Sequence, residues 1–121
     1  MMVGRVESLH ALLPIPLRLH GQPNLSIEFV VDSGFTDYLT LPPAAVEAIG
    51  LPFLYDLPIN LANDSDVTVP VYQATILWHG IERDVRVFAT GRRPLLGTRL
   101  LAGHEVVIQF GENGLVTVDP L

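Results

Sequence analysis

The sequence contains no cysteine and no lysine. Without cysteine, the chain cannot form disulfides, use a thiolate nucleophile or bind zinc through sulfur. All 7 basic side chains are arginines, and 13 Asp and Glu residues oppose them, which gives a net charge of −6. Nucleic-acid binding rests on clustered cations, so this acidic balance argues against a nucleic-acid partner.

Long apolar runs and a secretion signal are also missing. The longest stretch without Asp, Glu or Arg covers residues 67–81, and Pro70, Gln73 and Gly80 interrupt it. A membrane-spanning helix needs about 20 apolar residues. The first residues do not follow the pattern of a signal peptide. We therefore expect no membrane partner and, given the lack of cysteine, a cytoplasmic location.

The composition of the chain indicates one folded domain. The chain has 121 residues, of which 49% are hydrophobic and 17% charged, so it can bury a core and is not mainly disordered. The 10 prolines and 10 glycines are spread along the chain as turn punctuation, and no flexible linker divides it. We expect a single domain over residues 1–121.

The hydrophobic periodicity is mostly that of strands. Leu13, Ile15, Leu17 and Leu19 alternate with other residues and predict a strand over 13–19. Its two prolines predict a position at a sheet edge or only partial pairing. Further strands are predicted over 25–32, 38–41, 57–61, 67–78, 81–89, 105–110 and 115–118, and short helices over 44–49 and 97–102. The pattern indicates a mainly β fold, a closed and largely antiparallel barrel with two short helices.

The densest chemical signal lies at the end of one apolar strand, where Asp32, Ser33 and Gly34 follow one another. A carboxylate in this position is costly unless it is used or paired. Gly34 permits a tight turn, and Ser33 can hydrogen-bond locally to hold that turn. Taken alone, these three residues also fit an ordinary Asx turn between a strand and a loop.

A second motif changes this interpretation. Leu95, Leu96 and Gly97 precede the second predicted helix, so the two halves of the chain repeat one template of strand, loop, apolar pair, glycine and helix. With both motifs in order, the sequence resembles the retropepsin-like aspartic proteases, and closely the small bacterial and cyanobacterial members of clan AA. The resemblance covers roughly residues 16–121. Residues 31–34 match the family's Asp-Thr/Ser-Gly motif, residues 61–65 fall at its flap, and residues 38–42 and 77–80 resemble the bacterial members.

The resemblance implies a homodimer, because each chain carries only one such motif. Each chain would contribute Asp32 to a catalytic dyad that shares one proton and activates a water for peptide-bond hydrolysis. Ser33 and Gly34 would support the dyad, through a hydrogen bond across the dimer and a carbonyl that faces the substrate. The N-terminal segment and residues 116–118 would form an intermolecular sheet. No metal or cofactor is implied.

Substrate contacts are expected at Phe35 and at the flap residues Ala62, Asn63, Asp64 and Ser65. We predict that the flap is a mobile lid over Asp32. Two of these positions depart from the family. Phe35 stands where viral enzymes usually carry alanine, and the flap tip lacks the glycine of many relatives. Asn and Asp tolerate left-handed turn geometry, so the tip can still form a hairpin turn.

Other interpretations stay open. A non-catalytic member of the same fold would serve as a dimerisation or peptide-binding module, and an unrelated β-barrel would bind a small ligand. Asp37 fits either a charge at the edge of the substrate site or a solvated loop carboxylate, and the solvated carboxylate is expected. The four histidines, at positions 10, 20, 79 and 104, lack the grouping of a metal site and are expected at the surface or in turns.

Overall fold

Ten strands and two short helices form the chain, which a computed structural model describes over residues 1–121. Neither helix has the length and apolar character that crossing a membrane requires. The strands are β1 Met2–Glu7, β2 His10–Arg18, β3 Leu25–Val31, β4 Leu39–Leu41, β5 Phe53–Asn60, β6 Asp66–Trp78, β7 Ile81–Ala89, β8 Leu95–Leu96, β9 His104–Ile108 and β10 Leu115–Pro120, and the helices are α1 Pro43–Ile49 and α2 Thr98–Leu101.

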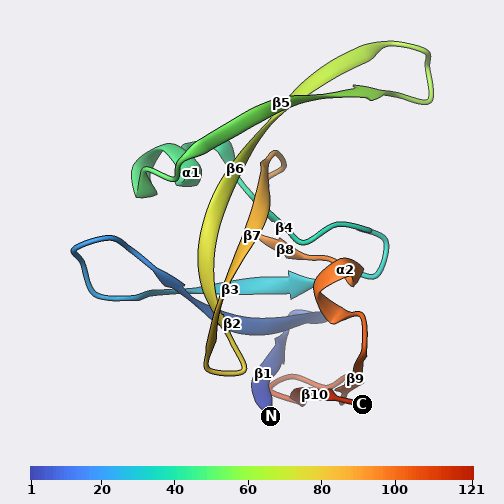
Figure 1. Ribbon diagram of the computed structural model, residues 1–121. Helices are drawn as coiled ribbons and strands as arrows, with labels where there is room; N and C mark the ends of the chain where they lie inside the picture. The colour runs from blue at the N-terminus through green and yellow to red at the C-terminus, as the bar shows by residue number, and fades with distance from the viewer.

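All ten strands belong to one sheet, in the order β5-β6-β7-β4-β8-β3-β2-β1-β10-β9 (Figure 1). The pairs β3–β8 and β4–β7 are parallel, and the other neighbours are antiparallel. An additional antiparallel contact joins β2 to β6, where Leu17 faces Ile76 and Arg18 faces Thr75. The mainly β class with two short helices is thus confirmed. The closed barrel stays a prediction.

Strand β2 was expected at a sheet edge or only partly paired, and the structure has it inside the sheet order with partial pairing. It pairs with β3 along most of its length, so its prolines stand inside the sheet order, opposite Glu28 and Ser26. On its other side, β1 pairs only with residues 10–12 and β6 only with residues 17–18. Pro14 and Pro16 fall in the gap between these two partners, where no ladder bond needs an N–H. The expectation of partial pairing therefore agrees with the structure.

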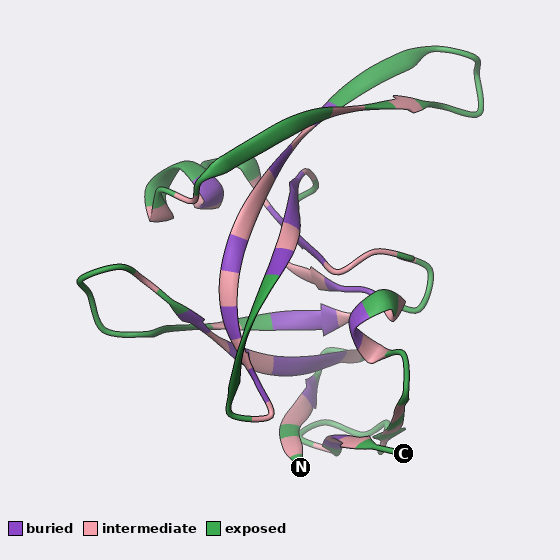
Figure 2. Ribbon diagram, in the orientation of Figure 1, coloured by how far each residue is buried: buried purple, intermediate pink, exposed green.

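Residues that alternate along the strands form the main core, a cluster of 16 buried residues that includes Leu13, Phe29, Ile76 and Val87. The long β6–β7 hairpin curves through the molecule, and buried and less buried residues alternate along it (Figure 2). His79 and Gly80 turn this hairpin with positive φ angles of 52° and 76°, as a tight two-residue turn requires.

The two ends of the chain pair with each other. Strand β1, for which no strand range was predicted from the hydrophobic pattern, is antiparallel to β10, with Met2 opposite Val118 and Val3 opposite Thr117. The expected intermolecular sheet used these same two segments. The structure pairs them within one chain, and β9 forms the outer edge of the sheet at this end.

At the opposite end of the sheet, β5 is the edge strand, and with β6 it forms a long arm. This arm extends away from the body, on the same side as the loop that follows β3 (Figure 1). Its outer part is exposed (Figure 2). Strand β5 begins at Phe53, four residues before the predicted start at Leu57, because its irregular pairing near Phe53 and Tyr55 hides the alternation.

Candidate active site

The fold brings the two sequence motifs together. Strand β8 lies parallel to the end of β3, with Leu95 opposite Val30 and Leu96 opposite Val31. The ladder continues past the strand end, because the Asp32 N–H donates to the Leu96 carbonyl over 2.9 Å. Asp32 therefore begins its loop held directly against the second motif, although 64 residues separate it from Leu96 in the sequence (96 − 32).

Asp32, Ser33 and Gly34 form a tight Asx-type turn. The Gly34 N–H donates to Asp32 Oδ1 over 2.9 Å, and the Phe35 N–H donates to the Asp32 carbonyl over 3.2 Å. Asp32 is half-buried, whereas Ser33 and Gly34 are exposed. The turn thus orients a carboxylate at the surface of the chain, where a second molecule can reach it.

Gly97 explains why the second motif ends in glycine. A Cβ at this position would lie 2.1 Å from the Asp37 carbonyl oxygen and 2.7 Å from both the ring and the carbonyl oxygen of Phe35. The backbone comes this close because the Gly97 N–H donates to the Tyr38 carbonyl over 2.9 Å and the Thr98 N–H to the Phe35 carbonyl over 2.8 Å. The start of α2 therefore packs onto the loop that carries Asp32.

Asp37 corrects another expectation, because it is not a solvated carboxylate. Its side chain is only 14% exposed and forms a bidentate ion pair with Arg86 of β7, with Nε–Oδ1 and Nη2–Oδ2 distances of 2.9 and 2.7 Å. Arg86 also donates to the Tyr55 hydroxyl over 3.0 Å. The hydrogen bond to Asp37 and, to a smaller extent, the hydrogen bond to Tyr55 raise the pKa of Arg86 further above its usual high value.

Phe35, an expected substrate contact, is half-buried and packs beneath the arm. Its ring meets Phe88 edge-to-face, with 5.7 Å between centroids. Both belong to a small apolar cluster that also contains Val69, Leu57 and Ile59 from β5 and β6. Aromatic pairs in this geometry add packing energy beyond the area they bury. The loop after Asp32 is thereby in contact with the root of the arm.

The other expected substrate contacts, Ala62, Asn63, Asp64 and Ser65, are all exposed at the tip of the arm. Asp64 adopts a positive φ of 62°, the left-handed geometry that Asp tolerates. Asn63 Oδ1 accepts from the Ser65 N–H over 3.1 Å and from the Ser65 hydroxyl over 2.6 Å. The tip is therefore ordered by hydrogen bonds among its own residues. Its closure over Asp32 stays a prediction.

The histidines at 79 and 104 lie together, a pairing that the sequence analysis missed because 25 residues separate them (104 − 79). Their rings stack with 5.0 Å between centroids, and both meet Trp78 edge-to-face. Burial lowers the pKa of His79, and charge repulsion from the neighbouring His104 lowers it further. No group of three or more His, Asp or Glu side chains in the structure is placed to hold a metal ion.

No family model matches the chain, and no curated protein matches it. Among solved structures, it is similar to a retropepsin-like aspartic protease from Rickettsia conorii, with a TM-score of 0.52 and 14% sequence identity. The similarity covers 100% of this chain and 91% of that protein. The chain has a retropepsin-like fold.

Proposed function

We propose that the protein is an aspartic endopeptidase, active as a homodimer in which the two Asp32 carboxylates form the catalytic dyad. The observation that carries the proposal is the joining of the two motifs: the Asp32 N–H binds the Leu96 carbonyl, within a fold shared along the whole chain with a retropepsin-like aspartic protease. Peptides or proteins are the proposed substrates, and the cytoplasm is the proposed location.

The chemistry follows from two like charges held close together. Two carboxylates a few ångströms apart cannot both ionise cheaply, so the pair shares a proton and titrates as a unit. The ionised Asp32 takes a proton from a water, and the protonated Asp32 of the second chain polarises the peptide carbonyl. The water attacks the carbonyl carbon, and the C–N bond then breaks as the amine takes up a proton. No covalent enzyme intermediate forms.

A dimer is needed because one chain holds one half of this site. Two-fold symmetry turns a single exposed Asp32 turn into a matched pair. Ser33 and Gly34 are exposed beside Asp32, which suits their proposed roles at the dimer floor and toward the substrate backbone. We propose that the open edge of β9 adds to the dimer, since β1 and β10 already pair within the chain.

The test is cleavage of a peptide library by the wild type and by Asp32→Asn. The amide can hydrogen-bond but cannot take a proton from water, so cleavage should be lost while the fold remains. The matched control, Glu47→Gln, makes the same carboxylate-to-amide change at an exposed position on α1 and should cleave normally. Equal cleavage by Asp32→Asn and wild type would remove Asp32 from the mechanism.

A second measurement separates the enzyme from the non-catalytic module. A peptide analogue that carries a tetrahedral hydroxyl in place of the scissile carbonyl should bind the wild type more tightly than the peptide itself, because an enzyme complements its transition state. A folded protein that binds both equally and cleaves neither is the peptide-binding module instead.

A further inference from the structure

The Asp37–Arg86 ion pair joins parts of the chain that no sequence motif connects. Asp37 stands three residues after Gly34 in the loop that carries Asp32, and Arg86 lies on β7. Both nitrogen–oxygen distances of the pair are below 3 Å, at 2.9 and 2.7 Å, and Asp37 is mostly buried. A planar guanidinium in this bidentate geometry fixes orientation as well as charge.

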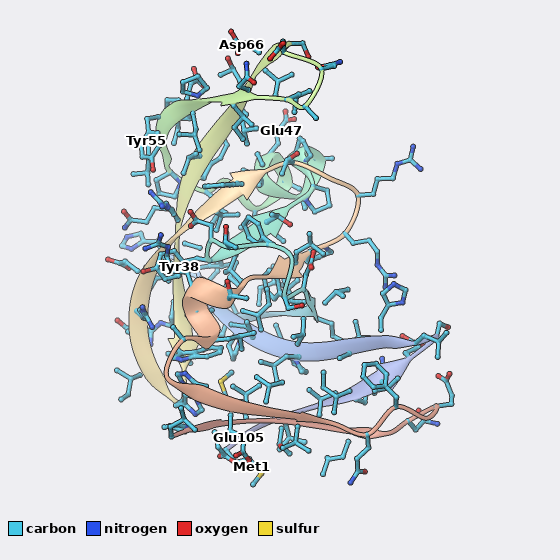
Figure 3. All side chains as sticks on the ribbon, turned by 90° about the vertical axis from the view of Figure 1, so that its right-hand side faces the viewer. Met1, Tyr38, Glu47, Tyr55, Asp66 and Glu105 are labelled. Atoms are coloured by element: carbon cyan, nitrogen blue, oxygen red, sulfur yellow. The ribbon has the colours of Figure 1, made fainter.

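The same guanidinium also reaches the arm. Arg86 Nη1 donates to the hydroxyl of Tyr55, which stands on β5 near the root of the arm. Figure 3 shows Tyr55 and Tyr38 on one side of the molecule, with Asp66 at the far end of the arm. One arginine thus touches the loop through Asp37 and the arm through Tyr55.

The arm joins the body through β6, which pairs with β7 from Val71 onward and with β2 near its end. Strand β5 is at the edge of the sheet and pairs only with β6. Beyond that ladder, the arm meets the loop through the Tyr55–Arg86–Asp37 bridge and through the apolar contacts around Phe35 and Phe88. The Arg86 guanidinium also lies 5.9 Å from the centre of the Phe88 ring, so the two connections adjoin each other. These two adjoining connections tie β5 to the loop that carries Asp32.

We infer that Tyr55, Arg86 and Asp37 form a positioning bridge that couples the arm to the loop carrying Asp32. A movement at the root of the arm pulls on Arg86, and the fork of Arg86 passes it to Asp37 and so to the Asp32 turn. In the protease proposed above, the bridge aligns the carboxylate when the arm moves. That catalytic consequence rests on the proposed function, whereas the mechanical coupling does not.

Amide hydrogen exchange tests the coupling without any activity. Asp37→Asn changes the loop end, and we expect exchange to become about tenfold faster at the arm, in residues 53–59, as well as in the loop. Tyr55→Phe removes one hydroxyl at an exposed side chain and should leave the fold intact. It should speed exchange in the loop, at residues 33–38, by severalfold. Effects confined to the mutated element in both variants would overturn the coupling.

Arg18→Gln is the matched control, because Arg18 makes an ion pair of 2.8 Å with Glu82, which is also on β7. Its pairing partner on β6 is Thr75, outside the residues of β6 that pair with β5. This variant should leave exchange in the loop and in the arm unchanged. If Arg18→Gln changed them as much as Asp37→Asn does, the effect would be a general loosening of β7, and the inference would be wrong.

Kinetics tests the catalytic consequence. Arg86→Lys keeps the positive charge but loses the fork, so we expect kcat to fall about tenfold with KM nearly unchanged, in protein that is fully folded at the assay temperature. A rise in KM alone, or wild-type kinetics, would contradict a positioning role. If the wild type shows no peptidase activity, the proposed function fails, and the exchange experiment still decides the coupling.

Discussion

Replacing Gly97 by alanine is a sharp test of how the candidate site is assembled. The added Cβ would stand 2.1 Å from the Asp37 carbonyl oxygen and 2.7 Å from the carbonyl oxygen of Phe35. Real Cβ atoms do not approach backbone this closely, and a carbonyl cannot rotate away as a flexible side chain can. The start of α2 and the loop must therefore separate.

The cost can be worked out from these contacts. Overpacking a well-filled site costs about 1–3 kcal/mol. Separation also strains two backbone hydrogen bonds, from Gly97 to the Tyr38 carbonyl and from Thr98 to the Phe35 carbonyl, at 2.9 and 2.8 Å. At about 1 kcal/mol for each bond, the free energy of unfolding should fall by roughly 3–5 kcal/mol. This is a large part of the stability of a small domain.

Urea unfolding followed by the fluorescence of Trp78, the single and buried tryptophan, measures this change. All samples are compared at one protein concentration, because the proposed dimerisation would add to stability. Gly111→Ala is the control, since a Cβ there meets nothing within 4 Å and its φ is not positive. It should stay within about 0.5 kcal/mol of the wild type. A similarly small effect for Gly97→Ala would refute the packing of α2 onto the Asp32 loop.

Three further predictions concern the turn, the histidine pair and the tip of the arm. Gly34→Ala should reduce stability by less than about 1 kcal/mol but lower kcat, because its Cβ would press on Asp32 Oδ1 at 3.2 Å; unchanged kcat would contradict the placement of that carboxylate. The lowered pKa of His79 means that the unfolded chain binds its proton more readily. The free energy of unfolding of the wild type should therefore fall as the pH drops below about 6.5. His79→Asn, whose new side chain tolerates the positive φ of this position, should lose less free energy of unfolding between about pH 7 and pH 5 than the wild type, as measured by urea unfolding at each pH. Amide exchange at Asn63 and its neighbours should slow when a transition-state analogue binds, and unchanged exchange would mean that the tip is no lid.

Local chemistry made much of the secondary structure predictable. Proline at 43 and glycine at 50, which adopts a φ of 78°, bracket α1 as capping rules require. Strand β7 was predicted with its observed bounds, Ile81–Ala89, because its apolar side chains and the turn before it are clear. The contact between the two motifs was not predicted from the sequence, since Val30 of β3 and Leu95 of β8, which pair, are 65 residues apart (95 − 30).

Long-range partners were the part that sequence reasoning missed. Nothing near Asp37 in the sequence indicates that Arg86, 49 residues away, neutralises it. The stack of the rings of residues 79 and 104 depends in the same way on the folding of the β6–β7 turn against the terminal strands. The prolines of β2 predicted its partial pairing but not its place inside the sheet, for a related reason. Along one side of β2, β1 pairs with residues 10–12 and β6 with residues 17–18, so the residues between them form no ladder on that side. The local sequence pattern does not indicate this arrangement.

Subunit mixing tests the central claim, a dyad built from two chains, most directly. Wild-type protein at a fixed concentration is mixed with an equal amount of Asp32→Asn, exchanged to equilibrium and assayed for peptide cleavage. If both carboxylates are needed, half of the wild-type chains will sit in inactive mixed dimers, and activity will fall to about half. If each chain acts alone, activity will remain at the wild-type level. If Asp32 has no role in catalysis, the variant chains will cleave as well, and activity will rise to about twice that level.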